Sequence, residues 1–166
     1  MDSPLFIMQH IRIVTKQPNF FFHMVQMSMK KKINKDVGTA LHKAASNNSN
    51  ETTEVLLSHG SNVKEDYEHG ETALHYAAYK NSKETTEVLL SHGSNVNEKD
   101  KDVGTALHYA AYKNSNETAE LLLSHGANVN EKDKYGFTAL HIAAIENSKE
   151  TSEHLLSHGA NVNEKV

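Results

Sequence analysis

Histidine is the residue in this chain with the greatest potential for chemistry, because 12 of the 166 residues are histidines. Histidine side chains bind transition metals and act as general acids or bases near neutral pH. Eight of them occur in only two sequence contexts, each present four times at a constant spacing. The first context is T-A-L-H, with His42, His75, His108 and His141, and the second is S-H-G, with His59, His92, His125 and His158. Each context therefore supplies one imidazole per repeat of the sequence.

The spacing of these histidines argues against a metal or catalytic site. The T-A-L-H copies begin 33 residues apart, at Thr39, Thr72, Thr105 and Thr138. If the repeats stack through helices, equivalent residues of neighbouring repeats lie roughly 10 Å apart. Zinc ligands lie about 2.0–2.1 Å from the ion, so one row cannot supply two ligands to one ion without distortion. We therefore expect structural histidines, no metal and no cofactor, and a zinc-binding or catalytic use is the competing hypothesis.

Carboxylates are also numerous, particularly between the repeats. Glu98, Asp100, Asp102, Glu131 and Asp133 alternate with lysines there. A pair of catalytic carboxyl groups needs a cleft that raises one pKa, and an open polar segment does not provide one. The chain has no cysteine and no G-x-S-x-G, P-loop, G-x-G-x-x-G or H-E-x-x-H motif. These observations predict that the protein is not an enzyme.

Charge is distributed unevenly along the chain. Residues 1–35 contain six basic residues and one acidic residue, so they carry +5, and the net charge of -4 leaves -9 for residues 36–166. An acidic array is poorly suited to binding a phosphate backbone. No apolar run approaches the ~20 residues that cross a bilayer, and no secretory signal is recognisable. We expect an intracellular, cytoplasmic monomer that binds neither nucleic acid nor membranes.

The repeated unit itself predicts two short helices and a loop. In the third copy, Thr105 is expected to begin a helix over residues 106–112, and Asn114 is expected to end it with a positive φ. Ser115 is then expected to cap a second helix, which ends at the glycine of S-H-G. These glycines are Gly60, Gly93, Gly126 and Gly159. A polar segment connects each second helix to the next copy.

The pattern T-A-L-H-Y-A-A, followed by E-x-x-E-x-L-L-x-H-G-A-N-V-N-E-K-D, resembles the ankyrin repeat in both wording and period. The resemblance implies an all-α helix-turn-helix solenoid with extended finger loops, in which the T-x-x-H histidine ties its helix to neighbouring loops. The four repeats are 36–68, 69–101, 102–134 and 135–166. Asparagine replaces the glycine that the family usually has between the two helices. The finger glycine is displaced by one position in repeats one and three, where Val37 and Val103 take its place, so we expect these fingers to bend differently.

The resemblance also implies a function, which is to bind another protein on the concave face formed by the fingers and the first helices. The positions after the A-A pair form a tyrosine and isoleucine stripe next to lysines, with the aromatic character of interface hot spots. The candidate binding residues are Tyr79, Lys80, Tyr112, Lys113, Ile145 and Glu146 on the helices and Tyr135 and Phe137 on the last finger. Alternatively, the two helix tyrosines only pack along the array. Phe137 is expected to be exposed at a turn apex.

The composition changes sharply near Lys35. All five methionines and both prolines precede it, and all eight glycines follow it. Residues 1–35 either cap the first repeat with a helix, or are unstructured, or bind a surface of their own. For the whole chain, the alternative to a binding module is a structural spacer or a fragment of a longer array, because repeats two and three are nearly identical.

Overall fold

The computed structural model describes residues 38–67 and 69–166. The chain divides into two compact units, residues 1–37 and 38–166, and the described residues all belong to the second. The predictions for residues 1–35, including a capping helix, therefore fall outside the described residues. In the second unit, eight helices form four antiparallel pairs, which confirms the predicted all-α solenoid with finger loops.

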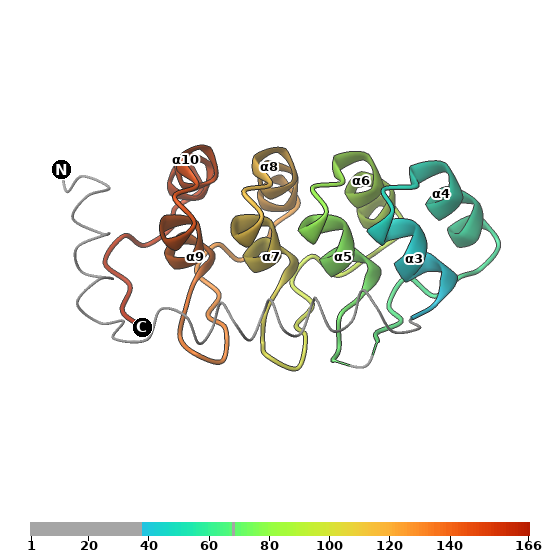
Figure 1. The fold of residues 1–166 in the computed structure, drawn as a ribbon, viewed down its shortest axis with the longest axis horizontal. Coiled ribbons are helices and arrows are strands. Elements are labelled where there is room, and N and C mark those ends of the chain that lie inside the picture. The colour runs from blue at the N-terminus through green and yellow to red at the C-terminus, as the bar shows by residue number, and fades with distance from the viewer. Residues whose placement is uncertain (1–37, 68) are drawn as a thin grey trace. The chain divides into compact units, whose positions relative to one another are not determined.

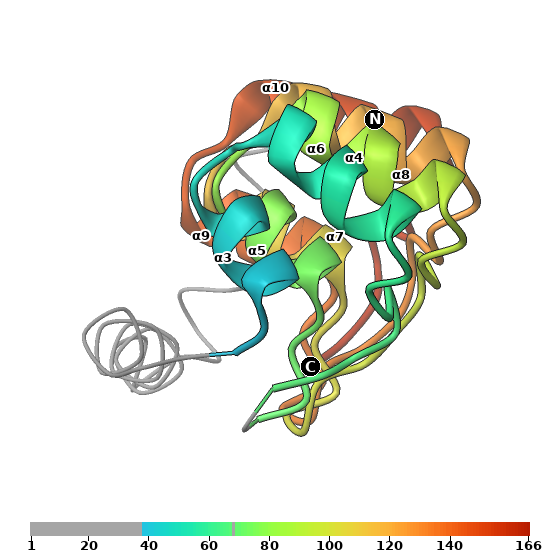
Figure 2. The same cartoon turned by 90° about the vertical axis from the view of Figure 1, so that its right-hand side faces the viewer.

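Each repeat contributes a first helix of seven residues and a second helix of nine. The first helices are α3 (Ala40–Ser46), α5 (Ala73–Tyr79), α7 (Ala106–Tyr112) and α9 (Ala139–Ile145). The second helices are α4 (Asn50–Ser58), α6 (Lys83–Ser91), α8 (Asn116–Ser124) and α10 (Lys149–Ser157). Figure 1 shows the two kinds of helix in two parallel rows, with the fingers extending from the row of first helices. Figure 2, along the array, shows the same two layers end-on.

An asparagine in the left-handed conformation ends each first helix, as the sequence predicts. After α5, the N–H of Asn81 donates to Ala78 at 3.3 Å and the N–H of Ser82 donates to Ala77 at 3.0 Å. These two bonds form a Schellman motif, which requires a positive φ at the asparagine. The four asparagines have φ values of 53°, 54°, 52° and 56°, at Asn48, Asn81, Asn114 and Asn147. The chain reverses within this turn, and the second helix packs against the first.

The serine after each asparagine occupies the predicted N-cap position, but its hydroxyl makes no capping hydrogen bond. Ser82, Ser115 and Ser148 are buried, and their hydroxyl groups have no hydrogen-bond partner within the described residues. Their ψ angles of 79°, 70° and 82° differ from the value of 171° at Thr72, where the backbone is extended. An extended backbone is typical of a capping residue. The different ψ turns the serine side chain away from the first amides of the second helix.

The core is a ladder of small and branched residues that runs through the repeats. The alanine pairs of the first three repeats are almost fully buried, for example Ala77 and Ala78, which allows the helices to approach closely. Leucines of the second helices, such as Leu89 and Leu122, are 0% exposed. Each pair of helices therefore buries its apolar side against its neighbours, as in other repeat solenoids.

Val103 has a positive φ, a backbone conformation that glycine adopts at the equivalent position of two other fingers. Its φ is 63°, and the equivalent Gly70 and Gly136 have φ values of 81° and 86°. In the third finger, Oδ1 of Asp100 accepts hydrogen bonds from the N–H groups two and four residues later, both at 2.8 Å. Asp133 makes the same two bonds in the fourth finger, at 2.8 and 2.9 Å. The expectation that the third finger bends differently is therefore wrong, because the aspartate imposes the same turn and Val103 accepts the strain.

Candidate functional site

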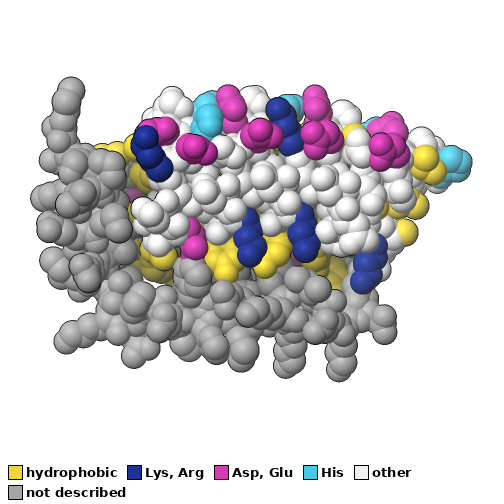
Figure 3. All heavy atoms as spheres, turned by 45° about the horizontal axis from the view of Figure 1, so that its top comes forward, with side chains coloured by type: hydrophobic (Ala, Val, Ile, Leu, Met, Phe, Trp, Pro, Cys, Tyr) yellow, Lys and Arg dark blue, Asp and Glu magenta, His cyan; other side chains and the backbone are white. Residues whose placement is uncertain are grey.

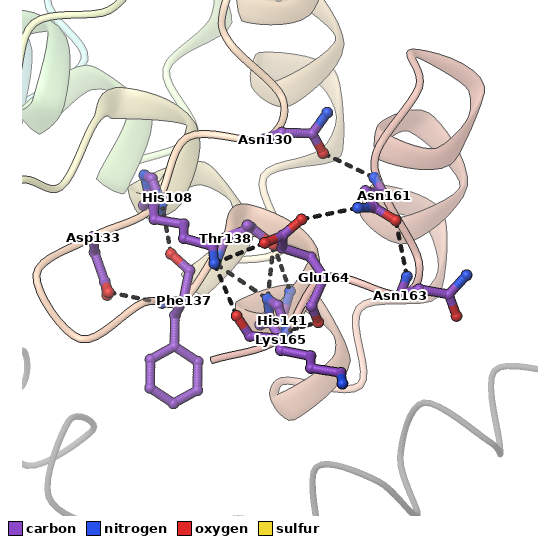
Figure 4. Close-up of polar contacts among 11 residues, drawn as sticks. His108, Asn130, Asp133, Phe137, Thr138, His141, Asn161, Asn163, Glu164 and Lys165 are labelled. Atoms are coloured by element: carbon purple, nitrogen blue, oxygen red, sulfur yellow. Dashed lines mark hydrogen bonds and ion pairs between the residues drawn. The ribbon is translucent and has the colours of Figure 1, made fainter.

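The T-A-L-H histidine links the start of its own helix to the next finger. His75 Nδ1 accepts a hydrogen bond from the backbone N–H of Thr72 at 3.0 Å. Its Nε2 donates to the carbonyls of Glu98 and Gly104, at 3.1 and 3.3 Å. Because a backbone N–H can only donate and a carbonyl can only accept, these contacts fix the neutral tautomer with hydrogen on Nε2. His42, His108 and His141 reach carbonyls of the following finger in the same way, at 3.1–3.2 Å; Figure 4 shows the last two.

Burial keeps these four imidazoles neutral. Desolvation is the largest cause that lowers each pKa, and it lowers the pKa of His108 to about 4. Both ring nitrogens already have hydrogen-bond partners, so neither is available to a metal or a substrate. Within residues 38–67 and 69–166, no group of three or more histidine, cysteine or acidic side chains could hold a metal ion.

The S-H-G histidines have a different local role at the ends of the second helices. His92 Nδ1 donates to the carbonyl of Val88, four residues earlier, at 3.0 Å. The other three make the same contact at 2.8–2.9 Å. All four histidines are exposed. The carbonyl of Val88 also accepts a hydrogen bond from the backbone N–H of His92 at 3.2 Å, so the imidazole adds a second hydrogen bond at the end of the helix.

The predicted binding residues of the first helices lie next to one another on the surface. The rings of Tyr79 and Tyr112 stack with their centroids 6.2 Å apart and their planes at 24°. Lys113 Nζ lies 4.4 Å from the centroid of Tyr79 and 5.0 Å from that of Tyr112, and Lys80 Nζ lies 5.9 Å from that of Tyr79. We call Tyr79, Lys80, Tyr112, Lys113, Ile145 and Glu146 the stripe. Tyr112 is 9% exposed and Tyr79 is half-buried, so the two tyrosines do pack along the array while both lysines stay exposed.

The last repeat continues the stripe with Ile145 and Glu146, which are both half-buried. The Oε1 atom of Glu146 is buried and has no hydrogen-bond partner among the described residues. Desolvation raises the pKa of this carboxyl, and the charge of Lys113 partly opposes the shift. The stripe therefore ends in a hydrogen-bond acceptor that lacks a donor.

The two finger aromatics lie away from the stripe. Phe137 precedes α9 and Ile145 is its last residue, so the rise of the helix, roughly 10 Å, separates them. Phe137 is half-buried, and its ring packs edge-on against His141 with centroids 6.0 Å apart. Phe137 is therefore only partly exposed, although it is more exposed than the buried Tyr112, because its ring packs against the histidine. Tyr135 lies at the turn, where Lys134 Nζ is 4.9 Å from its ring centroid.

Lysines of the fingers form ion pairs between neighbouring repeats, and lysines of the stripe do not. Lys99, Lys132 and Lys134 contact Glu131, Glu164 and Asp102, at 2.8, 2.7 and 2.5 Å. In the described part of the chain, no carboxylate oxygen lies within 4.0 Å of Nζ of Lys80 or Lys113. This distinction was not predicted from the sequence, although the recurring lysine and glutamate 32 residues apart gave a signal for it.

Two finger asparagines form a further link that the sequence analysis missed. Asn97 Nδ2 donates to the carbonyl of Gly126 at 3.1 Å, and Asn97 Oδ1 accepts from the N–H of Asn128 at 2.7 Å. Asn130 makes the same pair of bonds to the last repeat, at 3.2 and 2.8 Å, and Figure 4 shows its contact with Asn161. The first repeat has Lys64 at this position. The recurring N-V-N was the available signal.

Paired helices in two stacked rows and fingers tethered to neighbouring repeats define a helical repeat solenoid. The family model for ankyrin repeats (3 copies) matches residues 10–100 and 94–166, so the chain belongs to the ankyrin repeat family. Ankyrin repeats are generally protein–protein interaction modules, and the family is generally non-catalytic. No curated protein is similar enough to be matched to the chain. None of the described helices is both long and apolar enough to cross a membrane.

Proposed function

We propose that this chain is a non-catalytic module that binds another protein through the stripe, on the concave side formed by first helices and fingers. The observation that carries the proposal is the position of Lys113, an exposed cation over the faces of Tyr79 and Tyr112. The repeat fold does not require these residue types, because Ser46 and Asn47 occupy the equivalent positions of the first repeat. Binding to a partner explains the clustering of these tyrosines and lysines in repeats two and three better than a requirement of the fold does.

The stripe has the physical properties of a preformed interface. Two stacked tyrosine rings have few rotatable bonds, so they lose little conformational entropy when a partner covers them. Lys80 and Lys113 supply charge beside an apolar contact, and such charges set the orientation and rate of association more than the affinity. Ile145 extends the apolar part of the surface into the last repeat.

Affinity capture with the full chain tests the proposal. The stripe variant is Tyr79→Ser/Lys80→Ser/Lys113→Ser, which leaves the buried Tyr112 unchanged. The matched control is Lys83→Ser/Val88→Ser/Lys149→Ser, which changes side chains on the second helices. Circular dichroism must first show that both variants are folded. We expect a protein that the wild type and the control retain and the stripe variant loses, and about a tenfold weaker affinity for that purified protein with the stripe variant. Equal retention by all three chains would contradict a binding role of the stripe.

A structural spacer is the second candidate function, and a specific observation favours it. From Thr72 and Thr105 onward, repeats two and three differ at only four of 30 aligned positions, at residues 83, 86, 88 and 94 of the second repeat. A surface adapted to one partner usually varies more from repeat to repeat. A spacer predicts that no captured protein depends on the stripe. Urea unfolding adds to this test, because a self-sufficient module should unfold cooperatively and a piece of a larger array should lose structure gradually.

A further inference from the structure

Acidic side chains outnumber lysines on the second helices, and lysines are prominent beside the first helices. Figure 3 shows a row of mostly acidic side chains with two lysines among them, and a second row in which lysines lie beside hydrophobic side chains. Eight glutamates of the second helices are exposed, namely Glu51, Glu54, Glu84, Glu87, Glu117, Glu120, Glu150 and Glu153. Residues 36–166 are acidic overall, yet the stripe presents lysines.

The charge of the stripe changes along the array. The position directly after each first helix is neutral, positive, positive and negative in repeats one to four, namely Asn47, Lys80, Lys113 and Glu146. Lys80 and Lys113 have no carboxylate within 4.0 Å among the described residues, unlike the finger lysines. An ammonium over an aromatic face keeps its full charge and loses part of its hydration, so it can still attract an anion. The two central repeats therefore offer two cations that the rest of the array does not neutralise.

A partner must place a different chemical group on the fourth repeat, because Glu146 takes the position of the lysines there. Glu146 Oε1 is buried without a hydrogen-bond partner among the described residues, and leaving such an acceptor unsatisfied is unfavourable. Ile145 lies beside it and is half-buried. A partner that covers this end gains most if it places an apolar side chain on Ile145 and an N–H or O–H group near Glu146.

We propose that the stripe binds an extended acidic segment of a partner protein, with its carboxylates on Lys80 and Lys113 and a hydrogen-bond donor on Glu146. This inference rests on the proposed function. Equivalent residues of stacked repeats lie roughly 10 Å apart. An extended chain rises about 3 Å per residue, so acidic residues about three positions apart reach both lysines. The order of charges also fixes the order of the partner's groups along the array, with the acidic residues over repeats two and three and the donor over repeat four.

Selection from a random-peptide display library tests this inference without knowledge of the natural partner. The full chain, Lys80→Gln/Lys113→Gln and the matched control Lys83→Gln/Lys149→Gln are used in parallel. We expect the wild type and the control to enrich peptides with aspartate or glutamate about three positions apart. The stripe variant should lose that enrichment. A selected peptide should bind the stripe variant about tenfold more weakly and lose affinity in high salt, and its glutamine-substituted version should bind weakly to every chain.

Other outcomes separate a failure of this inference from a failure of the proposed function. If Tyr79→Ala abolishes binding of the selected peptides but they carry no excess of acidic residues, the stripe binds proteins and the acidic preference is wrong. If no selected peptide depends on any stripe residue, both proposals are wrong. Tighter binding of a single-stranded oligonucleotide than of the selected peptides would also overturn the inference, because the anion would then be a phosphate.

Discussion

Asn81 of the second repeat accepts a hydrogen bond from Thr118 of the third repeat, with 3.1 Å between Oδ1 and Oγ1. The same bond joins Asn48 to Thr85 and Asn114 to Thr151, also at 3.1 Å. The three threonines are fully buried. Each asparagine therefore does two things, because its backbone turns the chain with a positive φ and its amide holds the second helix of the next repeat. Glycine, which the family usually has at this turn, could perform only the first.

Replacing Asn81 with glycine should therefore destabilise the array. Glycine adopts the positive φ more readily than asparagine, which stabilises the turn by about 1 kcal/mol. The buried hydroxyl of Thr118 loses its partner, which costs about 1–3 kcal/mol. We expect a net loss of about 1 kcal/mol, measured by urea unfolding.

Asn147→Gly is the matched control, because Asn147 has the same φ of 56° but accepts no such bond from a threonine among the described residues. This variant should be as stable as the wild type or more stable. In a double-mutant cycle, Thr118→Ala should cost less in the Asn81→Gly background than in the wild type. Equal losses in both backgrounds would show that the hydrogen bond contributes nothing.

Lowering the pH should reduce the stability of the repeat array, because its four buried histidines are neutral in the folded protein. The pKa of His108 falls from 6.5 to about 4 in the folded protein, so between these pH values the unfolded chain binds a proton that the folded chain does not. The contribution of the neutral His108 to the free energy of unfolding is therefore fully present above about pH 6.5, and it is lost as the pH falls toward about 4. For His108 alone, the loss amounts to about 3 kcal/mol.

The measurement is urea unfolding across this pH range for the wild type and for His108→Asn. The carboxyl groups of Asp133 and Glu146 have raised pKa values and change stability in the opposite direction, so the difference between the two chains is the informative quantity. The variant should be less stable at neutral pH and should depend less on pH. An identical pH dependence in both chains would contradict the neutral, buried state of His108.

Replacing the strained Val103 with glycine should stabilise the third finger. A β-branched residue at a φ of 63° costs about 1–2 kcal/mol, and the greater freedom of glycine in the unfolded chain offsets part of the gain. We expect a net increase of about 0.5–1 kcal/mol and a melting temperature higher by roughly 2–4 °C. Gly136→Val, the reverse change at the equivalent position, should lower stability. If both changes destabilise, the side chain of Val103 contributes more through its contacts than its backbone costs.

The interface between repeats one and two should become stronger if Lys64 is replaced with asparagine. Asn97 and Asn130 each bridge to the next repeat through two hydrogen bonds, and the equivalent partners for residue 64 are the Gly93 carbonyl and the Asn95 N–H. We expect Lys64→Asn to raise the free energy of unfolding by about 1 kcal/mol. Lys64→Ala removes the same charge without an amide and serves as the control. A similar gain in both variants would assign the effect to charge alone.

Much of the backbone follows from local sequence. The helix predicted over residues 106–112 is Ala106–Tyr112 in the structure, and the asparagine predicted to end it has a positive φ. These features depend on groups a few residues apart, such as the capping threonine, the hydrogen bonds of the Schellman turn and the alanine pair. The 33-residue period repeats them four times, so the solenoid is already defined by the sequence.

Burial within the stripe could not be predicted in this way. Tyr79 and Tyr112 have identical neighbours from T-A-L-H to Asn-Ser, yet Tyr79 is half-buried and Tyr112 is buried. The two tyrosines occupy equivalent positions in adjacent repeats, where the next equivalent residues are Ser46 before Tyr79 and Ile145 after Tyr112. A side chain's exposure depends on what the next repeat places beside it, and local propensity does not contain that information.

The two finger aspartates also show which contacts follow from local sequence and which depend on the tertiary structure. The sequence determined that Asp100 and Asp133 lie in equivalent fingers, where both hold the turn with two backbone hydrogen bonds. The partners of their remaining oxygens depend on the tertiary structure. Asp100 Oδ2 accepts a hydrogen bond from the hydroxyl of Tyr109. Asp133 Oδ2 is buried without a partner in the described part of the chain, because Ile142 replaces that tyrosine. Local backbone bonds form wherever their few residues occur. Contacts between a finger and a helix, or between one repeat and the next, depend on how the stacked elements bring distant side chains together.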